Sequence, residues 1–128
     1  MSSMKLTRRA EKIGAACLSY RAVKLDGSGN IIPTTAETDD VYAVTCETSS
    51  DLVGDSIPCE YSDIVKLTVG AAVVKGARLM PQAAGAGKVI TAVGASSKVL
   101  GEAMEPASGD GQRIHVRLYA NRRTVLGS

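Results

Sequence analysis

The chain has 128 residues and a mass of 13.2 kDa, which is the size of one ordinary domain. It is 45% hydrophobic and 22% charged, a composition that excludes disorder for most of the chain. The chain has no Trp or Phe, so its hydrophobic residues are mostly small. The net charge of +2 disfavours a dedicated nucleic-acid binder, and the longest apolar run, Leu67 to Val74, is far shorter than the roughly 20 residues of a membrane-spanning helix.

The first segment, residues 1–12, is polar and basic and has no amphipathic period, so it predicts a flexible N-terminal arm. The arm carries four cationic side chains that are candidates for contacts with a partner: Lys5, Arg8, Arg9 and Lys12. The Arg8-Arg9 pair precedes an apolar run of six residues, whereas an export signal needs about 7–15. We therefore expect no export signal.

A β-hairpin is the first regular element that the sequence predicts. Residues 20–25 have strand character, residues 26–30 form a strong turn cluster, and residues 31–33 begin the returning strand. An acidic loop follows at residues 34–40. Further short strands are expected at residues 41–46, 56–60, 64–69, 71–74, 78–80, 89–93 and 98–104.

The last predicted strand has the clearest pattern, because polar and apolar residues alternate along it with a period of two. Its polar face carries four further contact candidates: Arg113, His115, Arg117 and Tyr119. Roughly nine short strands without a helical pattern predict an all-β sandwich or barrel. We assign this domain to residues 13–120 and a C-terminal tail to residues 121–128.

Charge is divided along the chain. Between Leu25 and Val65 there are nine acidic residues and no Lys or Arg, whereas between Lys66 and Gly101 there are five basic residues and no acid. Two solvated faces would explain this division. The alternative is head-to-tail self-association, in which the acidic part of one subunit contacts the basic part of the next.

No motif predicts catalysis, a metal or a cofactor. The three cysteines, Cys17, Cys46 and Cys59, lack C-x-x-C spacing and are expected to be small buried side chains. His115 is the single histidine and lies between two arginines, which disfavours its charged form and suits a contact surface. Residues 85–89 lack the residues of a phosphate loop and predict a hairpin tip. We expect no small-molecule substrate and no enzyme.

The order and spacing of five turn-strand blocks resemble the small capsid decoration, or cement, proteins of tailed bacteriophages. The resemblance covers roughly Gly14 to Leu118, and its blocks are residues 20–29, 54–57, 75–79, 99–104 and 109–118. It implies a non-enzymatic β-rich homotrimer, made in the host cytoplasm, that binds the major capsid protein on the outer surface of the head. Such a protein stabilises contacts between neighbouring major capsid subunits.

Two other classes of function remain open from the residues alone. A small nucleic-acid-binding β-barrel would use Arg113, His115, Arg117 and Tyr119 as a basic platform with one stacking ring. A hydrolase or transferase would use one of the cysteines, which would then have to be exposed and low in pKa.

Overall fold

A computed structural model describes residues 8–93 and 98–119. These ranges contain no helix, and therefore none that could cross a membrane. They contain ten strands: β1 (Arg8–Lys12), β2 (Ala22–Leu25), β3 (Ile31–Pro33), β4 (Ala43–Thr45), β5 (Ser56–Glu60), β6 (Ile64–Thr68), β7 (Arg78–Pro81), β8 (Val89–Thr91), β9 (Gly101–Ala103) and β10 (Arg113–Leu118).

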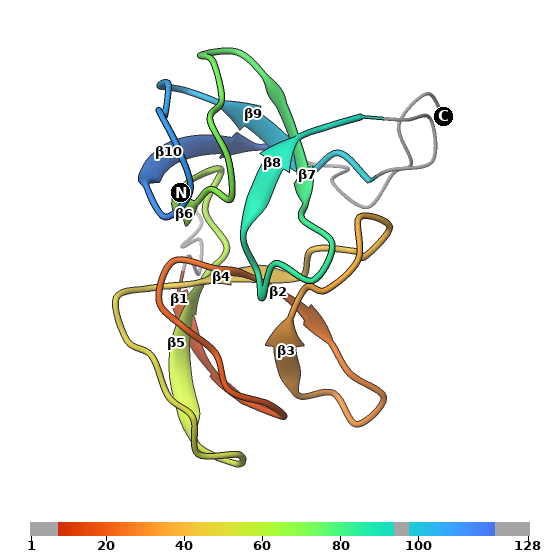
Figure 1. Cartoon of the computed structure of the whole chain (residues 1–128). Helices are drawn as coiled ribbons and strands as arrows, with labels where there is room; N and C mark the ends of the chain where they lie inside the picture. The colour runs from red at the N-terminus through yellow and green to blue at the C-terminus, as the bar shows by residue number, and fades with distance from the viewer. Residues whose placement is uncertain (1–7, 94–97, 120–128) are drawn as a thin grey trace, which may run out of the picture.

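The two halves of the chain form two separate sheets (Figure 1). The first sheet has the strand order β1-β5-β4-β2-β3 and the second the order β6-β10-β9-β7-β8, and the paired strands are antiparallel. The all-β prediction is confirmed. The sheets pack as a sandwich and do not close, so the barrel alternative is wrong.

The first sheet buries apolar side chains on both faces, because successive residues of a strand point in opposite directions. Ala22 and Val44 belong to the large core that joins side chains of both sheets, whereas their neighbours Val23 and Ala43 belong to a second cluster. Ile13, in the loop after β1, packs in that second cluster. Small residues suit such thin layers, which explains how the chain folds without Trp or Phe.

Backbone hydrogen bonds tie the two sheets together. The N–H of Ala22 donates to the carbonyl of Gly87 over 2.8 Å, and the N–H of Gly87 donates to the carbonyl of Thr34 over 3.0 Å. A Cβ at position 87 would lie 2.8 Å from the Ala22 carbonyl oxygen, and φ there is +89°. Only glycine therefore lets the tip of the β7–β8 hairpin approach β2 so closely.

Several predicted elements are confirmed. Strands β2 and β3 form the expected hairpin, residues 82–88 form the expected hairpin tip, and the side chains of β10 alternate between exposed and buried. The predicted strand at residues 71–74 is wrong, because only Val73 makes a bridge there, to Ala107. The turn hydrogen bond from Ala77 N–H to the Val74 carbonyl ends any extended pairing.

The end of the predicted flexible arm is a strand instead. Residues 8–12 form β1 and pair along the whole of β5. The sequence pattern missed this because its one inward side chain is charged: Glu11 is buried, and it accepts hydrogen bonds from the hydroxyls of Tyr61 and Tyr42. Arg9 lies 3.5 Å from the same carboxylate. Residues 1–7 of the arm, with Lys5, and the predicted tail at 121–128 lie outside the described residues.

Candidate interaction surface

The outward face of β10 presents the predicted cations in one row. Arg113, His115 and Arg117 are all exposed, as the alternating pattern predicted. On the neighbouring strand β6, Lys66 lies directly opposite His115. On the other side, Glu102 of β9 lies opposite Arg117. The sheet register therefore adds one cation and one carboxylate that the sequence did not connect with this row.

Two members of the row are paired with carboxylates. The guanidinium of Arg117 donates to the carboxylate of Glu102, which raises the pKa of Arg117. The backbone N–H of His115 and its ring Nδ1 both lie 2.7 Å from one carboxylate oxygen of Glu105. These hydrogen bonds hold the pKa of Glu105 below its usual value. The β10 face is consequently a mixed surface and not a uniformly basic one.

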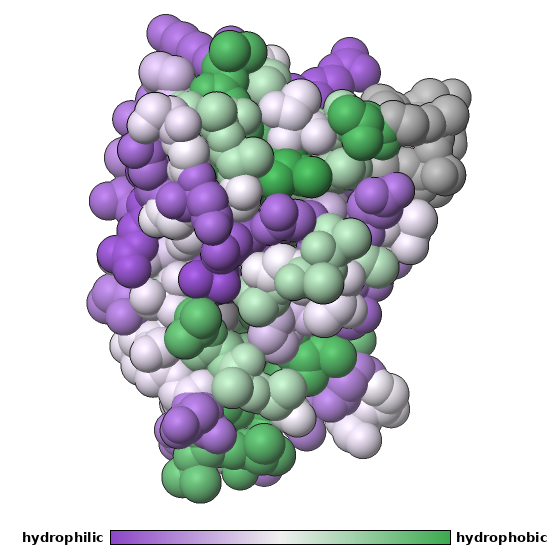
Figure 2. Space-filling model, viewed as in Figure 1, coloured by the Kyte–Doolittle hydropathy of each residue, from purple (hydrophilic) through white to green (hydrophobic). Residues whose placement is uncertain are grey.

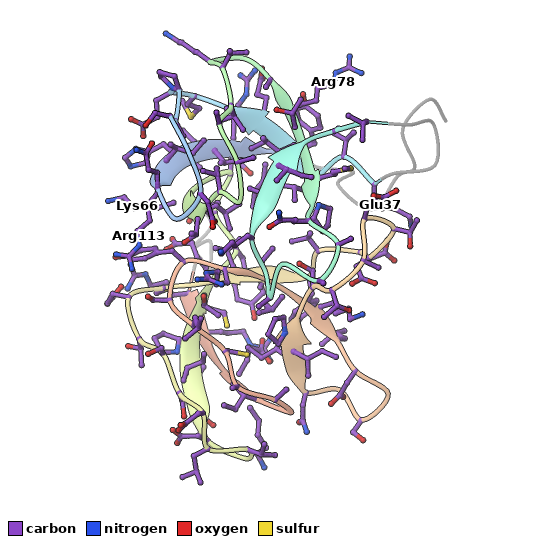
Figure 3. All side chains as sticks on the ribbon, viewed as in Figure 1. Glu37, Lys66, Arg78 and Arg113 are labelled. Carbon is purple, nitrogen blue, oxygen red and sulfur yellow. The ribbon has the colours of Figure 1, made fainter. Side chains whose placement is uncertain are left out.

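Lys66 and Arg113 both lie over the aromatic ring of Tyr20. The Arg113 guanidinium carbon lies 4.6 Å, and the Lys66 ammonium nitrogen 5.7 Å, from the centre of the Tyr20 ring. Figure 3 shows Lys66 and Arg113 on the same edge of the molecule. In the part of the chain that the structure describes, neither cation forms an ion pair.

A hollow of about 250 Å³ opens beside Tyr20, between the two sheets. Its lining brings together Arg8 of β1 and His115 of β10, two of the predicted contact residues from opposite ends of the chain. Arg8 lies 3.3 Å from Glu60 and 3.6 Å from Glu47, which both line the hollow. The hollow is therefore polar and carries both signs of charge.

The other predicted contact residues lie elsewhere. Arg9 contacts the carboxylate of Glu11, and Lys12 is exposed at the end of β1, opposite Ser56. The backbone N–H of Tyr119 donates to the carbonyl of Leu100. None of these three residues lines the hollow. The structure thus brings Arg8 and His115 together at the hollow, with Arg113 over the neighbouring Tyr20 ring, and the remaining predicted residues are dispersed.

Sequence reasoning missed an apolar tip at the far end of the first sheet. Leu52 and Val53 are 68% and 64% exposed in the turn before β5. The turn is well ordered by hydrogen bonds: Asp55 N–H donates to the Leu52 carbonyl over 3.0 Å, and the Ser50 hydroxyl donates to the Asp55 carboxylate over 2.8 Å. Figure 2 shows hydrophobic side chains gathered at this end of the molecule. The signal in the sequence was two adjacent branched aliphatic residues inside an otherwise polar loop.

The charge division follows the two sheets. The acidic segment forms β3, β4 and β5 of the first sheet, and most of the basic segment belongs to the second. The two segments meet within one chain where Lys98 Nζ lies 2.5 Å from Asp40. Glu37, from the acidic segment, lies on the opposite side of the molecule from Lys66 in Figure 3. Association between subunits through these charges stays a prediction.

The cysteines have the environment of core residues. Cys17, Cys46 and Cys59 are buried and unpaired. Burial raises the pKa of Cys17 to about 11 and that of Cys59 to about 12, and it also raises the pKa of Cys46. A thiol nucleophile needs the opposite shift. Among residues 8–93 and 98–119 no group of His, Cys, Asp and Glu side chains could hold a metal ion.

We predict that a thiol-directed reagent such as a disulfide dye labels none of the three cysteines in the native protein at pH 7.5. Both low exposure and raised pKa values oppose attack by the thiolate. The same reagent should label all three after unfolding in denaturant, which serves as the control. Fast labelling of one cysteine in the native protein would instead support the thiol-enzyme hypothesis.

The same pKa shifts predict a loss of stability at alkaline pH. Because an unfolded thiol has a pKa of about 8.5, the unfolded chain releases protons above this pH that the folded chain retains at Cys17 and Cys59. The free energy of unfolding should therefore fall from about pH 8.5 to 11. A double variant, Cys17→Ala/Cys59→Ala, should show a shallower fall in urea unfolding, and an unchanged slope would contradict the assignment.

The strands and core define an open sandwich of two five-stranded antiparallel sheets. This fold is similar to the structure of the head fiber gp8.5 N base in bacteriophage phi29, with a TM-score of 0.69 and 20% sequence identity. The match covers 94% of this chain and 98% of that chain. No protein-family model matches the chain, and no curated protein sequence matches it.

Proposed function

We propose that this chain is a structural protein of a bacteriophage head. The observation that carries the proposal is the similarity to the phi29 head fiber base, which extends over nearly the full length of both chains. The resemblance of the turn-strand blocks to phage decoration proteins supports it from the sequence. The two comparisons are independent in kind, since one uses residue order and the other uses the arrangement of strands.

The surface chemistry supports a non-enzymatic role. The described residues offer no metal-binding cluster, and the cysteines are buried with raised pKa values. The features that stand out are instead exposed contact surfaces: the cations around Tyr20 and the apolar tip of Leu52 and Val53. A protein that attaches to a shell needs such surfaces and no deep catalytic pocket.

The finer part of the proposal is that the chain binds the outer surface of the head as a homotrimer and stabilises contacts between major capsid subunits. Three copies would present three sets of contacts at once, so modest individual contacts would sum to stable attachment. Light scattering coupled to size exclusion tests the trimer, which should have three times the 13.2 kDa mass of the chain. A monomer at all concentrations, free and on heads, would contradict the trimer without affecting head attachment.

The N-terminal arm is proposed as one element that grips the head. Removal of residues 1–12 would also remove β1 and expose the edge of β5, so it would test the fold as much as the contact. We predict that a chain without residues 1–7, which include Lys5, occupies fewer sites when it is added to heads prepared without this protein. Its unfolding midpoint should stay unchanged. Occupancy equal to that of the full chain would contradict a role for these residues.

The nucleic-acid alternative is less well supported by the geometry. It was built on a small β-barrel with a basic platform, but the sheets stay open and two platform residues, His115 and Arg117, are paired with glutamates. Carboxylates within the platform repel a phosphate backbone. The alternative predicts binding that falls steeply with salt, so no gel shift of a nucleic acid at low salt would contradict it.

A further inference from the structure

Two exposed cations from different strands converge on one aromatic ring. Lys66 of β6 and Arg113 of β10 both lie over Tyr20, at 5.7 and 4.6 Å from the ring centre. The ring attracts each cation, but the two positive charges repel each other. Neither cation forms a direct ion pair within the described residues, so both can contact a further anion.

Tyr20 is held in a conformation that bulky residues rarely adopt. Its φ is +57°, in the left-handed region, where a bulky non-glycine residue is an outlier. The surroundings impose this conformation: the N–H of Tyr20 donates to the Cys46 carbonyl over 3.0 Å, and its carbonyl accepts from the Thr68 N–H over 2.8 Å. Such strain is concentrated at binding and active sites. Both sheets therefore fix this ring in place.

The charged neighbours of this pair are mostly engaged with each other. Glu105 is bonded to His115, with Lys66 contributing a weaker attraction, and Glu60 and Glu47 contact Arg8. A third cation, Arg21, lies nearby. Burial lowers the pKa of Arg21, and the positive charge of Arg113 lowers it further. An incoming anion would thus meet Lys66 at the edge of the hollow and Arg113 beside it, over the Tyr20 ring.

We propose that Lys66, Arg113 and Tyr20 form a binding site for an acidic segment of a partner protein. One or two carboxylates would lie between the two cations, with charge-assisted hydrogen bonds from the guanidinium and the ammonium group. A short protein segment fits better than a nucleic acid, because one or two carboxylates need only these two cations, whereas Glu102 and Glu105 interrupt the longer row that a phosphate backbone would follow. The site does not depend on attachment to a phage head, so it can be tested separately.

The test is a titration of the full chain, labelled with nitrogen-15, with a hexaglutamate peptide at low salt. The expected result is saturable chemical-shift change centred on Tyr20, Lys66 and Arg113. The variant Lys66→Gln/Arg113→Gln should bind at least about tenfold more weakly, since it removes both cationic donors that the carboxylates would contact. The variant Lys75→Gln/Arg78→Gln removes the same charge from exposed positions elsewhere and should bind as the parent does.

A third variant separates the ring from the charges. Tyr20→Asn keeps a residue that tolerates the left-handed backbone but removes the ring, and it should also weaken binding. Thermal unfolding checks that each variant is folded. We expect the charge variant to fold because both substituted cations are exposed. Equal weakening by both charge variants, or shifts remote from Tyr20, would overturn the site. Tighter binding of a single-stranded DNA oligonucleotide through the same two cations would overturn the assignment to an acidic protein.

Discussion

Leu67→Ala should lower the free energy of unfolding by about 2–5 kcal/mol, because it leaves a cavity in the core that joins the two sheets. The Leu67 side chain is fully buried and belongs to the large cluster, together with Ala22 of the first sheet and Ile114 of the second. A loss of this size is a large part of the 5–15 kcal/mol that typically stabilises a domain. Urea unfolding followed by circular dichroism measures it.

The matched control is Leu52→Ala, which makes the same chemical change at an exposed position. It should alter the free energy of unfolding by no more than about 0.5 kcal/mol. If Leu67→Ala does not accumulate as folded protein, Leu67→Met nearly conserves volume and should cost less than about 1.5 kcal/mol. Equal effects of Leu67→Ala and Leu52→Ala would contradict a common core between the sheets.

Leu52→Ser/Val53→Ser should weaken attachment to heads by about two orders of magnitude. Complete burial of one such side chain contributes about 1.5–3 kcal/mol, so the pair would supply at least about 3 kcal/mol to each contact if the tip inserts into the shell. Hydrogen bonds in the turn at Ser50 and Asp55 preorganise the apolar tip, which limits the conformational entropy lost on binding. Binding to heads that lack the protein, measured by sedimentation with the heads, gives the affinity.

Val74→Ser is the control for the apolar tip. Val74 is 71% exposed, at a turn of the second sheet, and its substitution removes a similar exposed aliphatic group. It should leave the affinity for heads unchanged. If the control weakens binding as much as the tip variant does, then the tip has no special role and general surface hydrophobicity is responsible.

The sequence predicted the parts of the fold in which local pattern and packing agree. Strand β10 alternates strictly, and the β2–β3 hairpin has the turn cluster of residues 26–30 between its strands. Strand β1 was missed because its stabilising contacts are long-range: its buried residue is Glu11, whose partners Tyr42 and Tyr61 are distant in sequence. A charged residue in a buried strand position has no local signal.

The sequence predicted only part of the candidate site, because the other contacts join residues that are distant in sequence. Period-two alternation placed Arg113, His115 and Arg117 on one face, and the structure confirms that placement. No local pattern indicated that Lys66 and Tyr20 join Arg113, because that cluster depends on the pairing of β6 with β10 and on the left-handed backbone at Tyr20. Nor did any local pattern indicate that Glu102 and Glu105 pair with Arg117 and His115. Sheet register places Lys66 and Glu102 beside β10, whereas Tyr20 and Glu105 reach it from segments between the strands.

The resemblance to phage decoration proteins anticipated an all-β fold, and the fold is similar to that of the phi29 head fiber base. Three statements stay predictions: membership of the decoration family, the trimer, and the stabilisation of contacts between major capsid subunits. They depend on surfaces that only the assembled particle brings together.

The most direct test is quantitative mass spectrometry of density-purified particles from the virus that encodes this chain, before and after mild protease treatment of intact heads. The account predicts many copies in each particle, with protease-accessible sites while the major capsid protein stays intact. Absence of the chain from purified particles, with the chain abundant in the infected-cell lysate, would contradict its role as a structural protein of the head.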